Sequence, residues 1–341
     1  MTTLQNFSSY PPFFRPNQGV VNGQHSLENS TEFDSDSSPQ SEQLPIIDFE
    51  ALDRAHLSEV CREWGMFRLT NHGVSAELLS QLHDHANKLF SQDFESKEGI
   101  PSTPMLYFWG NPALTMSANA HQKGPRADNH HNWLEGLNVS LTNISQSYCQ
   151  DPLLESFRCL LEEYVGHQTR LAKTIFSDMG EDLGLPPAKS RSYLSPPTGI
   201  IRVYRYLRCP AADRRWGIHD HTDSSVLSII HQDQVGGLQV FKNNQWMDVE
   251  PIHDTLIVNL GDMMQAMSDD KYVSVRHRVK VNRVKERVSI GYFVFPAEDG
   301  VIESSNYKPF TYADFKARNE LDLKILGAKI GLPRFRKEQS V

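Results

Sequence analysis

The sequence predicts a mainly β protein, in which a barrel or jelly roll is flanked by helices and preceded by a helical N-terminal region. Short apolar runs separated by turn residues follow one another from residue 199 to residue 295, and strands at this density favour a barrel or jelly roll. Apolar residues at helical spacing predict a long helix over 152–183, before this core. Helical periodicity returns in the tail, over 310–332.

The chain before the β core is expected to have two parts. Residues 1–43 are rich in Ser, Asn, Gln, Pro and Gly and lack hydrophobic periodicity. They bury too little apolar surface to offset their ordering entropy, so they are predicted to be a disordered leader. Residues 44–195 are predicted to be an α/β region that ends with the long helix. Its earlier elements are a strand, a helix, a strand, a helix and an aromatic, loop-rich segment: 44–49, 57–64, 66–69, 78–89 and 101–143.

The β core is predicted to span 196–300 and to be followed by a helical C-terminal extension, 301–341. The core strands are expected at 200–206, 226–230, 237–241, 246–249, 256–260, 272–281 and 287–295. Four apolar residues of the tail are expected to pack on the outside of this core: Phe315, Leu321, Leu323 and Ile325.

Composition and charge exclude several classes of protein. Lys and Arg number 34 against 42 Asp and Glu, a formal net charge of −8, and such a surface repels a nucleic-acid backbone. No apolar run approaches the roughly 20 residues that cross a bilayer, and the N-terminus has no secretory signal pattern. We expect a monomeric protein of the cytoplasm, with the nucleus as the alternative location, that acts on a small molecule.

A metal site is predicted around His221 and Asp223. On a strand, residues two apart share a face and lie about 6.6–6.8 Å apart, so both side chains can reach one ion between them. His219 lies on the same face but about 13 Å from Asp223 along the backbone, too far for all three to converge. We therefore expect His219 to support the site and a third ligand to come from elsewhere in the chain.

His277 is the candidate for that third ligand, because it alternates with valines on one face of a predicted strand. The alternative is a core histidine bonded to a carbonyl group. We expect a hairpin that pairs Val281 with Arg287 and so places His277 opposite Gly291. Arg287 would then lie about 13 Å along the strand from the metal. That gap suits a short dicarboxylate held by the arginine fork and by the hydroxyl of Ser289.

Two histidines and one carboxylate leave open positions on an octahedral ion, as in non-haem Fe(II) oxygenases. Zinc at the same three residues would make a hydrolase, but that reading leaves Arg287 and Ser289 without a role. A non-catalytic, ligand-binding jelly roll is the other rival, and an intact set of metal ligands argues against it.

With these residues the sequence resembles the plant Fe(II)- and 2-oxoglutarate-dependent dioxygenases. The resemblance extends from residue 44 to residue 335. Its motifs are the family's H-T-D at 221–223, its H-R-V at 277–279 and its R-x-S at 287–289. It implies a double-stranded β-helix, that is, a jelly-roll core.

The resemblance also implies the ligands and cofactors of the site. Fe(II) would be held by His221, Asp223 and His277, and no further side chain is expected to be catalytic. The cosubstrates would be 2-oxoglutarate and O₂, with ascorbate as a reductant. The far carboxylate of 2-oxoglutarate would lie on Arg287 and Ser289, with the hydroxyl of Tyr206 in contact. Tyr204 stands where the family usually has asparagine.

Phe293 and Trp133 are candidate walls of the substrate pocket, whereas His231 and His253, both expected in strands, are assigned structural roles. Trp133 begins a W-L-E-G segment that, together with residues 261–268, resembles gibberellin oxidases. A gibberellin or a gibberellin precursor is therefore the expected substrate. Flavonoids, auxins and similar metabolites are the alternatives.

Overall fold

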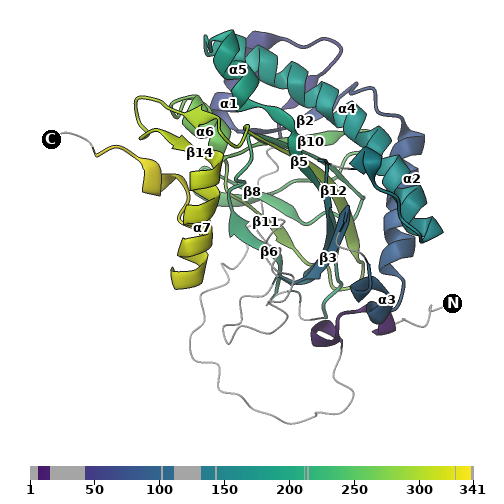
Figure 1. The fold of residues 1–341 in the computed structure, drawn as a ribbon. Helices are drawn as coiled ribbons and strands as arrows, with labels where there is room; N and C mark the ends of the chain where they lie inside the picture. Colours follow the sequence, from purple (N-terminus) through teal and green to yellow (C-terminus); the bar gives the residue numbers. More distant parts are fainter. Residues whose placement is uncertain are drawn as a thin grey trace.

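Two β-sheets pack face to face, and helices cover the outer face of the larger sheet (Figure 1). The computed structural model describes residues 7–15, 43–100, 103–110, 132–142, 144–210, 212, 215–326 and 328–338. The prediction of a mainly β protein with flanking helices and a jelly-roll core is confirmed.

The larger sheet contains eight strands in the order β1-β2-β10-β7-β12-β5-β4-β3. β1 and β2 are parallel, and every other neighbouring pair is antiparallel. Strands from the N-terminal region and from the β core thus share one sheet. Its strands are β1 (Ile46–Asp48), β2 (Met66–Thr70), β3 (Met105–Trp109), β4 (Leu134–Ser140), β5 (Ser195–Tyr206), β7 (Leu227–Gln232), β10 (Leu256–Leu260) and β12 (Arg287–Phe295).

The smaller sheet has the antiparallel order β6-β11-β8-β9. Its residues Leu238, Val240 and Val279 form one buried cluster with Tyr204 and Ile257 of the larger sheet, so the inner faces of the two sheets are in contact. The strands are β6 (Trp216–His221), β8 (Leu238–Lys242), β9 (Gln245–Asp248) and β11 (His277–Lys280), and a separate two-stranded ribbon joins β13 (Val301–Ile302) to β14 (Phe310–Thr311).

The predicted hairpin between Val281 and Arg287 is wrong. β11 lies between β6 and β8, whereas β12 lies between β7 and β5 in the other sheet. Both edges of each strand are therefore occupied, and the connection between them crosses from one sheet to the other. His277 pairs with His221 and Val240, not with Gly291. A polar turn of this length is compatible with either arrangement, so local sequence does not distinguish them.

Helices pack on the outer face of the larger sheet. The helix predicted over 152–183 is confirmed as α4, which begins after Asp151, whose carboxylate accepts a hydrogen bond from the Leu154 amide at 2.9 Å. α4 packs against α1 and α2 (Figure 1). The helices are α1 (Arg54–Glu63), α2 (Ala76–Phe90), α3 (Phe94–Glu98), α4 (Pro152–Asp182), α5 (Pro187–Tyr193), α6 (Asp262–Met267) and α7 (Tyr312–Leu326).

The C-terminal helix α7 is oriented differently from the prediction. Phe315 is buried, but Leu321 and Ile325 are 43% and 68% exposed, so the expectation that these two pack on the core is wrong. The helix buries Asp322 instead, whose carboxylate forms ion pairs with two arginines. A buried carboxylate needs charged partners, and the observed orientation of the helix provides them. The spacing of apolar residues does not reveal this requirement.

Part of the predicted leader is ordered, so the expectation of disorder is wrong for residues 7–15. They form two short 3-10 turns, η1 (Phe7–Ser9) and η2 (Pro12–Phe14). Tyr10 and Phe14 are buried and form a cluster with Leu207. The aromatic residues of this short segment supply the apolar surface that the rest of the leader lacks. The remaining leader residues, apart from residue 43, lie outside the described part of the chain.

A buried charge cluster ties this N-terminal segment to the sheet. Lys97 and Glu135 are fully buried and form an ion pair at 2.6 Å. Lys97 Nζ also donates to the carbonyl oxygens of Ser9 and Phe90, at 2.6 and 3.1 Å. Arg205 pairs with Glu135 at 2.8 Å. Two buried charges are thus satisfied by several partners, the condition under which such a pair is tolerated.

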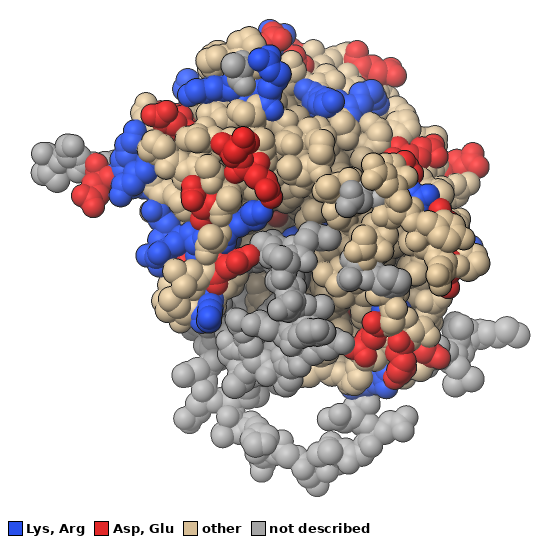
Figure 2. All heavy atoms as spheres, viewed as in Figure 1, with Lys and Arg blue, Asp and Glu red and all other residues tan. Residues whose placement is uncertain are grey.

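No helix in the described part of the chain is long and apolar enough to cross a membrane. On the face of the molecule shown in Figure 2, Lys and Arg side chains are interspersed with Asp and Glu side chains.

Replacing Lys97 by Met is expected to lower the free energy of unfolding by about 3 kcal/mol, because it removes one partner of a buried ion pair. Chemical denaturation of the purified protein measures this loss. Lys88→Met, which removes an exposed lysine of α2, is the matched control and should change the value by less than about 0.5 kcal/mol. Equal losses in both variants would contradict the prediction.

Candidate active site

Three potential metal ligands meet where β6 pairs with β11. His221 lies directly opposite His277 in this antiparallel pair. Asp223 lies two residues beyond the end of β6, in a loop and not on the predicted strand. Its Oδ1 is 3.6 Å from His221 Nε2 and 3.7 Å from His277 Nε2. These ligand atoms lie within 4.8 Å of one another, and this is the one such cluster of His, Cys, Asp or Glu among the described residues.

Both histidines are oriented by backbone carbonyls. Nδ1 of His221 lies 2.8 Å from the carbonyl oxygen of His219, and Nδ1 of His277 lies 3.2 Å from that of Val275. With Nδ1 protonated as the donor, each Nε2 carries the lone pair that a metal needs. Burial and the neighbouring His221 lower the pKa of His277 to about 4, which keeps its ring neutral near pH 7. His219 thus supports the site through its main chain.

Asp223 is held in place by two polar side chains. Its Oδ2 accepts hydrogen bonds from Asn259 Nδ2 at 2.7 Å and from Ser228 Oγ at 3.0 Å, which leaves Oδ1 for the cluster. Burial would raise the pKa of this carboxyl, but His277, His221 and Asn259 together hold the pKa well below its usual range. Asp223 is therefore ionised and ready to bind a cation.

The loop that carries Asp223 is fixed by a tight corner between β10 and α6. Asp262 N donates to the Asp223 carbonyl at 2.8 Å, and Met263 N donates to that of Ser225 at 3.2 Å. A Cβ atom at Gly261 would lie 2.1 Å from the Ser225 carbonyl oxygen. Only glycine therefore allows this approach, which sets the position of the metal-ligand loop.

A second polar group, on the larger sheet, surrounds Arg287. Arg287 and Ser289 are buried on β12, and Arg287 Nη2 donates to Gln232 Oε1 at 2.7 Å. The guanidinium lies 4.7 Å from the ring centroid of Tyr206, the residue opposite it on β5. Among the described residues, the buried Nε of Arg287 has no hydrogen-bond partner. This donor set fits the carboxylate of a bound ligand.

The smaller sheet lies close to the Arg287 group at Tyr206. Gly217 on β6 lies so close to Tyr206 that an added Cβ would be 2.5 Å from the tyrosine ring. Burial raises the pKa of the Tyr206 hydroxyl, although Arg287 opposes this effect. Tyr206 therefore stays protonated and able to donate a hydrogen bond.

The two candidate pocket walls lie in different surroundings. Phe293 is buried on the same strand as Arg287 and Ser289, with its ring centroid 5.3 Å from the Arg202 guanidinium. Trp133 packs against Phe14 of the N-terminal segment, at 4.6 Å between ring centroids. Both substrate roles remain predictions.

Tyr204, which replaces the family's asparagine, accepts a hydrogen bond from Arg202 Nη1 at 3.3 Å. Its ring lies 5.9 Å from that of Tyr206. The substitution thus exchanges an amide for a second buried tyrosine beside the predicted 2-oxoglutarate contact, and burial raises the pKa of Tyr204 to about 12.

Sequence reasoning missed Asn259, Ser228 and Gln232, which orient the charged groups of the site. Asn259 carried a usable signal, because it is the one polar residue in the otherwise apolar strand β10. Ser228 and Gln232 lie on β7, and their roles depend on neighbours from β10 and β12 that local sequence does not show.

His231 and His253 have no contact with the metal-ligand cluster. His231 lies on β7, with Nδ1 2.9 Å from His83 Nε2 of α2, so it links a helix to the sheet. His253 is exposed in a turn, and its predicted strand position is wrong.

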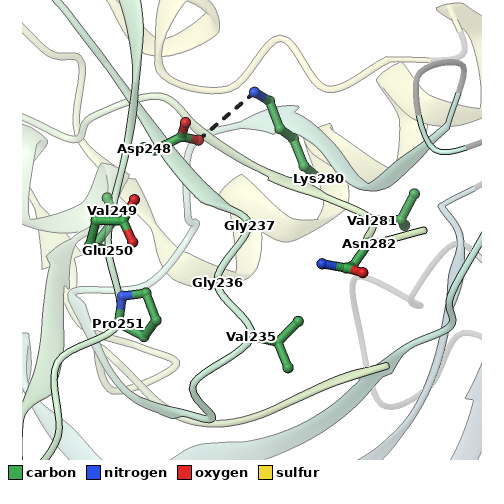
Figure 3. A pocket seen from close by; sticks show the side chains of 10 residues that line it. All are labelled: Val235, Gly236, Gly237, Asp248, Val249, Glu250, Pro251, Lys280, Val281 and Asn282. Carbon is green, nitrogen blue, oxygen red and sulfur yellow. Dashed lines mark ion pairs between the residues drawn. The ribbon is translucent and has the colours of Figure 1, made fainter. Parts of the chain in front are cut away.

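A hollow of about 270 Å³ lies elsewhere, near the ends of β8, β9 and β11 (Figure 3). It is lined by Gly236, Gly237 and Pro251, among others, and the Lys280–Asp248 ion pair, at 3.9 Å, lies at one side of it. None of the predicted site residues lines it.

Comparison with known proteins identifies the family. The sequence matches the 2OG-Fe(II) oxygenase superfamily over residues 197–296 and the non-haem dioxygenase in morphine synthesis N-terminal family over residues 44–152. Gibberellin 2-beta-dioxygenase 6 of Oryza sativa subsp. japonica is 35% identical, over 87% of this chain and 86% of its own. Gibberellin 2-beta-dioxygenase 8 of Arabidopsis thaliana is 33% identical, over 86% of this chain and 87% of its own.

A solved structure agrees with these matches. The crystal structure of JOX2 in complex with 2OG, Fe and JA is similar to this chain with a TM-score of 0.73 and 28% identity, covering 87% of this chain and 90% of the JOX2 chain. The fold and the ligand cluster are those of a non-haem iron oxygenase. The chain belongs to the 2OG-Fe(II) oxygenase superfamily and is an Fe(II)- and 2-oxoglutarate-dependent dioxygenase.

Arg287→Lys is expected to raise the KM for 2-oxoglutarate by about tenfold, because lysine keeps the charge but loses the planar fork. Succinate formation at varied 2-oxoglutarate concentrations measures this. Arg278→Lys is the matched control. Arg278 also donates to a glutamine, at 2.7 Å to Gln239, and stacks on an aromatic ring, but it is not part of the Arg287 group. An unchanged KM in Arg287→Lys would contradict the assignment.

The free energy of unfolding is expected to fall as the pH is lowered below about 6.5. Burial and the neighbouring His83 lower the pKa of His231 to about 3, so the unfolded chain binds a proton that the folded protein excludes. Each such histidine contributes a slope of about 1.4 kcal/mol per pH unit.

His231→Gln should therefore reduce the pH dependence of stability between pH 6.5 and pH 5, as measured by urea denaturation. His253→Gln, which replaces an exposed histidine, is the control and should keep the wild-type slope. A wild-type slope in His231→Gln would contradict the prediction.

Proposed function

We propose that this dioxygenase oxidises a gibberellin or a gibberellin precursor in plant hormone metabolism. The observation that carries the proposal is the similarity to gibberellin 2-beta-dioxygenases over most of both chains. The reaction class is that of the family, and the substrate is the inferred part.

We infer that His221, Asp223 and His277 hold Fe(II) through Nε2, Oδ1 and Nε2. The Nε2 atoms that face the cluster and the ionised carboxylate suit a divalent cation, and three protein ligands leave positions for a cosubstrate. Fe(II) bound there supplies the redox chemistry that couples the oxidative decarboxylation of 2-oxoglutarate by O₂ to the oxidation of a substrate C–H bond.

Arg287, Ser289 and Tyr206 would bind the far carboxylate of 2-oxoglutarate. Gln232 and the Tyr206 ring hold the guanidinium in one orientation, so little side-chain entropy is lost when the ligand arrives. Because this group is buried, each hydrogen bond to the carboxylate is strengthened by the exclusion of water. The role of this chain is thus to position the cosubstrate and to keep its surroundings dry.

A gibberellin is an apolar terpenoid that carries a carboxylate. Phe293 offers an apolar surface on the strand face shared with Arg287 and Ser289, and the Arg202 guanidinium beside it offers a positive charge. This pairing supports an apolar acid as the substrate class.

Another specialised metabolite, such as a flavonoid or an auxin, is the second candidate. The observation in its favour is the similarity to JOX2, whose crystal structure was determined with JA and not with a gibberellin. The two candidates differ only in the molecule that fits the pocket, so a substrate panel separates them.

The test is incubation of the purified enzyme with Fe(II), 2-oxoglutarate and ascorbate and with a panel of gibberellins, gibberellin precursors, an auxin and a flavonoid. We expect succinate formation that depends on a gibberellin, together with an oxidised product detected by mass spectrometry. Asp223→Ala, which removes a proposed metal ligand, should abolish turnover. Substrate-dependent succinate with another panel member and none with any gibberellin would refute the substrate assignment.

A further inference from the structure

A lysine from the C-terminal segment contacts the loop that follows β6 and carries the proposed metal ligand Asp223. Lys329 Nζ donates to the carbonyl oxygen of Thr222 at 2.9 Å and lies 3.5 Å from its hydroxyl. Thr222 is the residue between His221 and Asp223. The Lys329 side chain is only 15% exposed, so this contact is shielded from solvent.

The same ammonium group forms an ion pair with Asp262 at 2.6 Å. Asp262 contacts both ligand-bearing segments. Its main-chain N–H donates to the Asp223 carbonyl at 2.8 Å, and its Oδ1 accepts from Ser274 Oγ at 2.9 Å. Since Ser274 lies three residues before His277, the Lys329–Asp262 pair connects both segments of the metal-ligand cluster.

The C-terminal segment is itself fixed, which gives Lys329 a defined position. Leu332 is buried, and the Phe335 ring lies 4.5 Å from that of Phe310. Gly331 has a φ of +72°, and an added Cβ would lie 3.4 Å from Asp262 Oδ2. Glycine thus allows the turn that brings the segment back against the ion pair.

We propose that Lys329 is a positioning residue of the metal centre, which holds the loop between His221 and Asp223 in the geometry that binds the ion. The proposal rests on the ligand roles inferred above, but not on the identity of the organic substrate. If Lys329 only stabilised the fold, its replacement would lower the free energy of unfolding but leave the metal affinity unchanged. A purely electrostatic role predicts the opposite sign, because removing a positive charge near the site would tighten cation binding.

The experiment measures Mn²⁺ binding to the metal-free, full-length protein by electron paramagnetic resonance, without 2-oxoglutarate or substrate. Lys329→Met should raise the dissociation constant by about tenfold or more, the effect typical of residues that orient metal ligands. Lys316→Met is the matched control on α7, because Lys316 also forms an ion pair, with Glu298, and contacts a ring, that of Tyr312. Its dissociation constant should stay at the wild-type value.

Lys329→Gln keeps a hydrogen-bond donor for the Thr222 carbonyl, so the loop at Thr222 should be held partly in place. Its dissociation constant for Mn²⁺ should therefore lie within about threefold of the wild-type value. Thermal denaturation of each metal-free variant establishes that it is folded. Wild-type or tighter binding by Lys329→Met, or an equal loss in Lys316→Met, would overturn the proposal. Absence of Mn²⁺ binding by the wild-type protein would instead refute the ligand assignment on which it rests.

Discussion

The pairing of β6 with β11 is the contact on which the rest of the site depends. It places His221 opposite His277, with ring centroids 4.3 Å apart. Two imidazoles at this distance can share a cation only if the ring nitrogens that face it are unprotonated. Backbone carbonyls at the opposite nitrogens place the ring proton on Nδ1, and burial together with the neighbouring His221 keeps the His277 ring neutral although the ionised Asp223 favours its protonation. Main-chain hydrogen bonds therefore orient the histidine ligands, and these side chains need to move little when a metal binds.

The two sheets contribute different parts of the chemistry. The smaller sheet and the loop after β6 carry the proposed metal ligands, whereas β12 and β5 of the larger sheet carry the proposed carboxylate-binding group. Because the short connection between β11 and β12 crosses from one sheet to the other, the two ends of a small dicarboxylate can be held by segments close together in the chain. The buried interior between the sheets keeps that ligand away from water.

Segments distant in sequence stabilise this interior. Lys97 and Glu135 form a fully buried ion pair that also holds the main chain of Ser9, so the N-terminal segment is part of the folded protein. At the other end, Lys329 holds the loop that precedes Asp223. Both contacts use an ammonium group with several acceptors, which is how a buried lysine avoids the cost of an unpaired charge.

The sequence by itself indicated the chemistry and most of the elements: the proposed metal ligands and Arg287 follow from residue types and from the motifs shared with the family, and the long helix and most strands follow from periodicity. The strand spacing used to place Arg287 near the metal assumed a hairpin that does not form. The tertiary structure decided which strands pair, because each of β11 and β12 finds both its partners far away in the sequence. It also decided the supporting contacts of Asn259 and Lys329, and the burial of Tyr10 and Phe14. Hydrogen bonds and packing between distant segments leave no local pattern in the sequence, whereas the residue types that can bind a metal are visible in it.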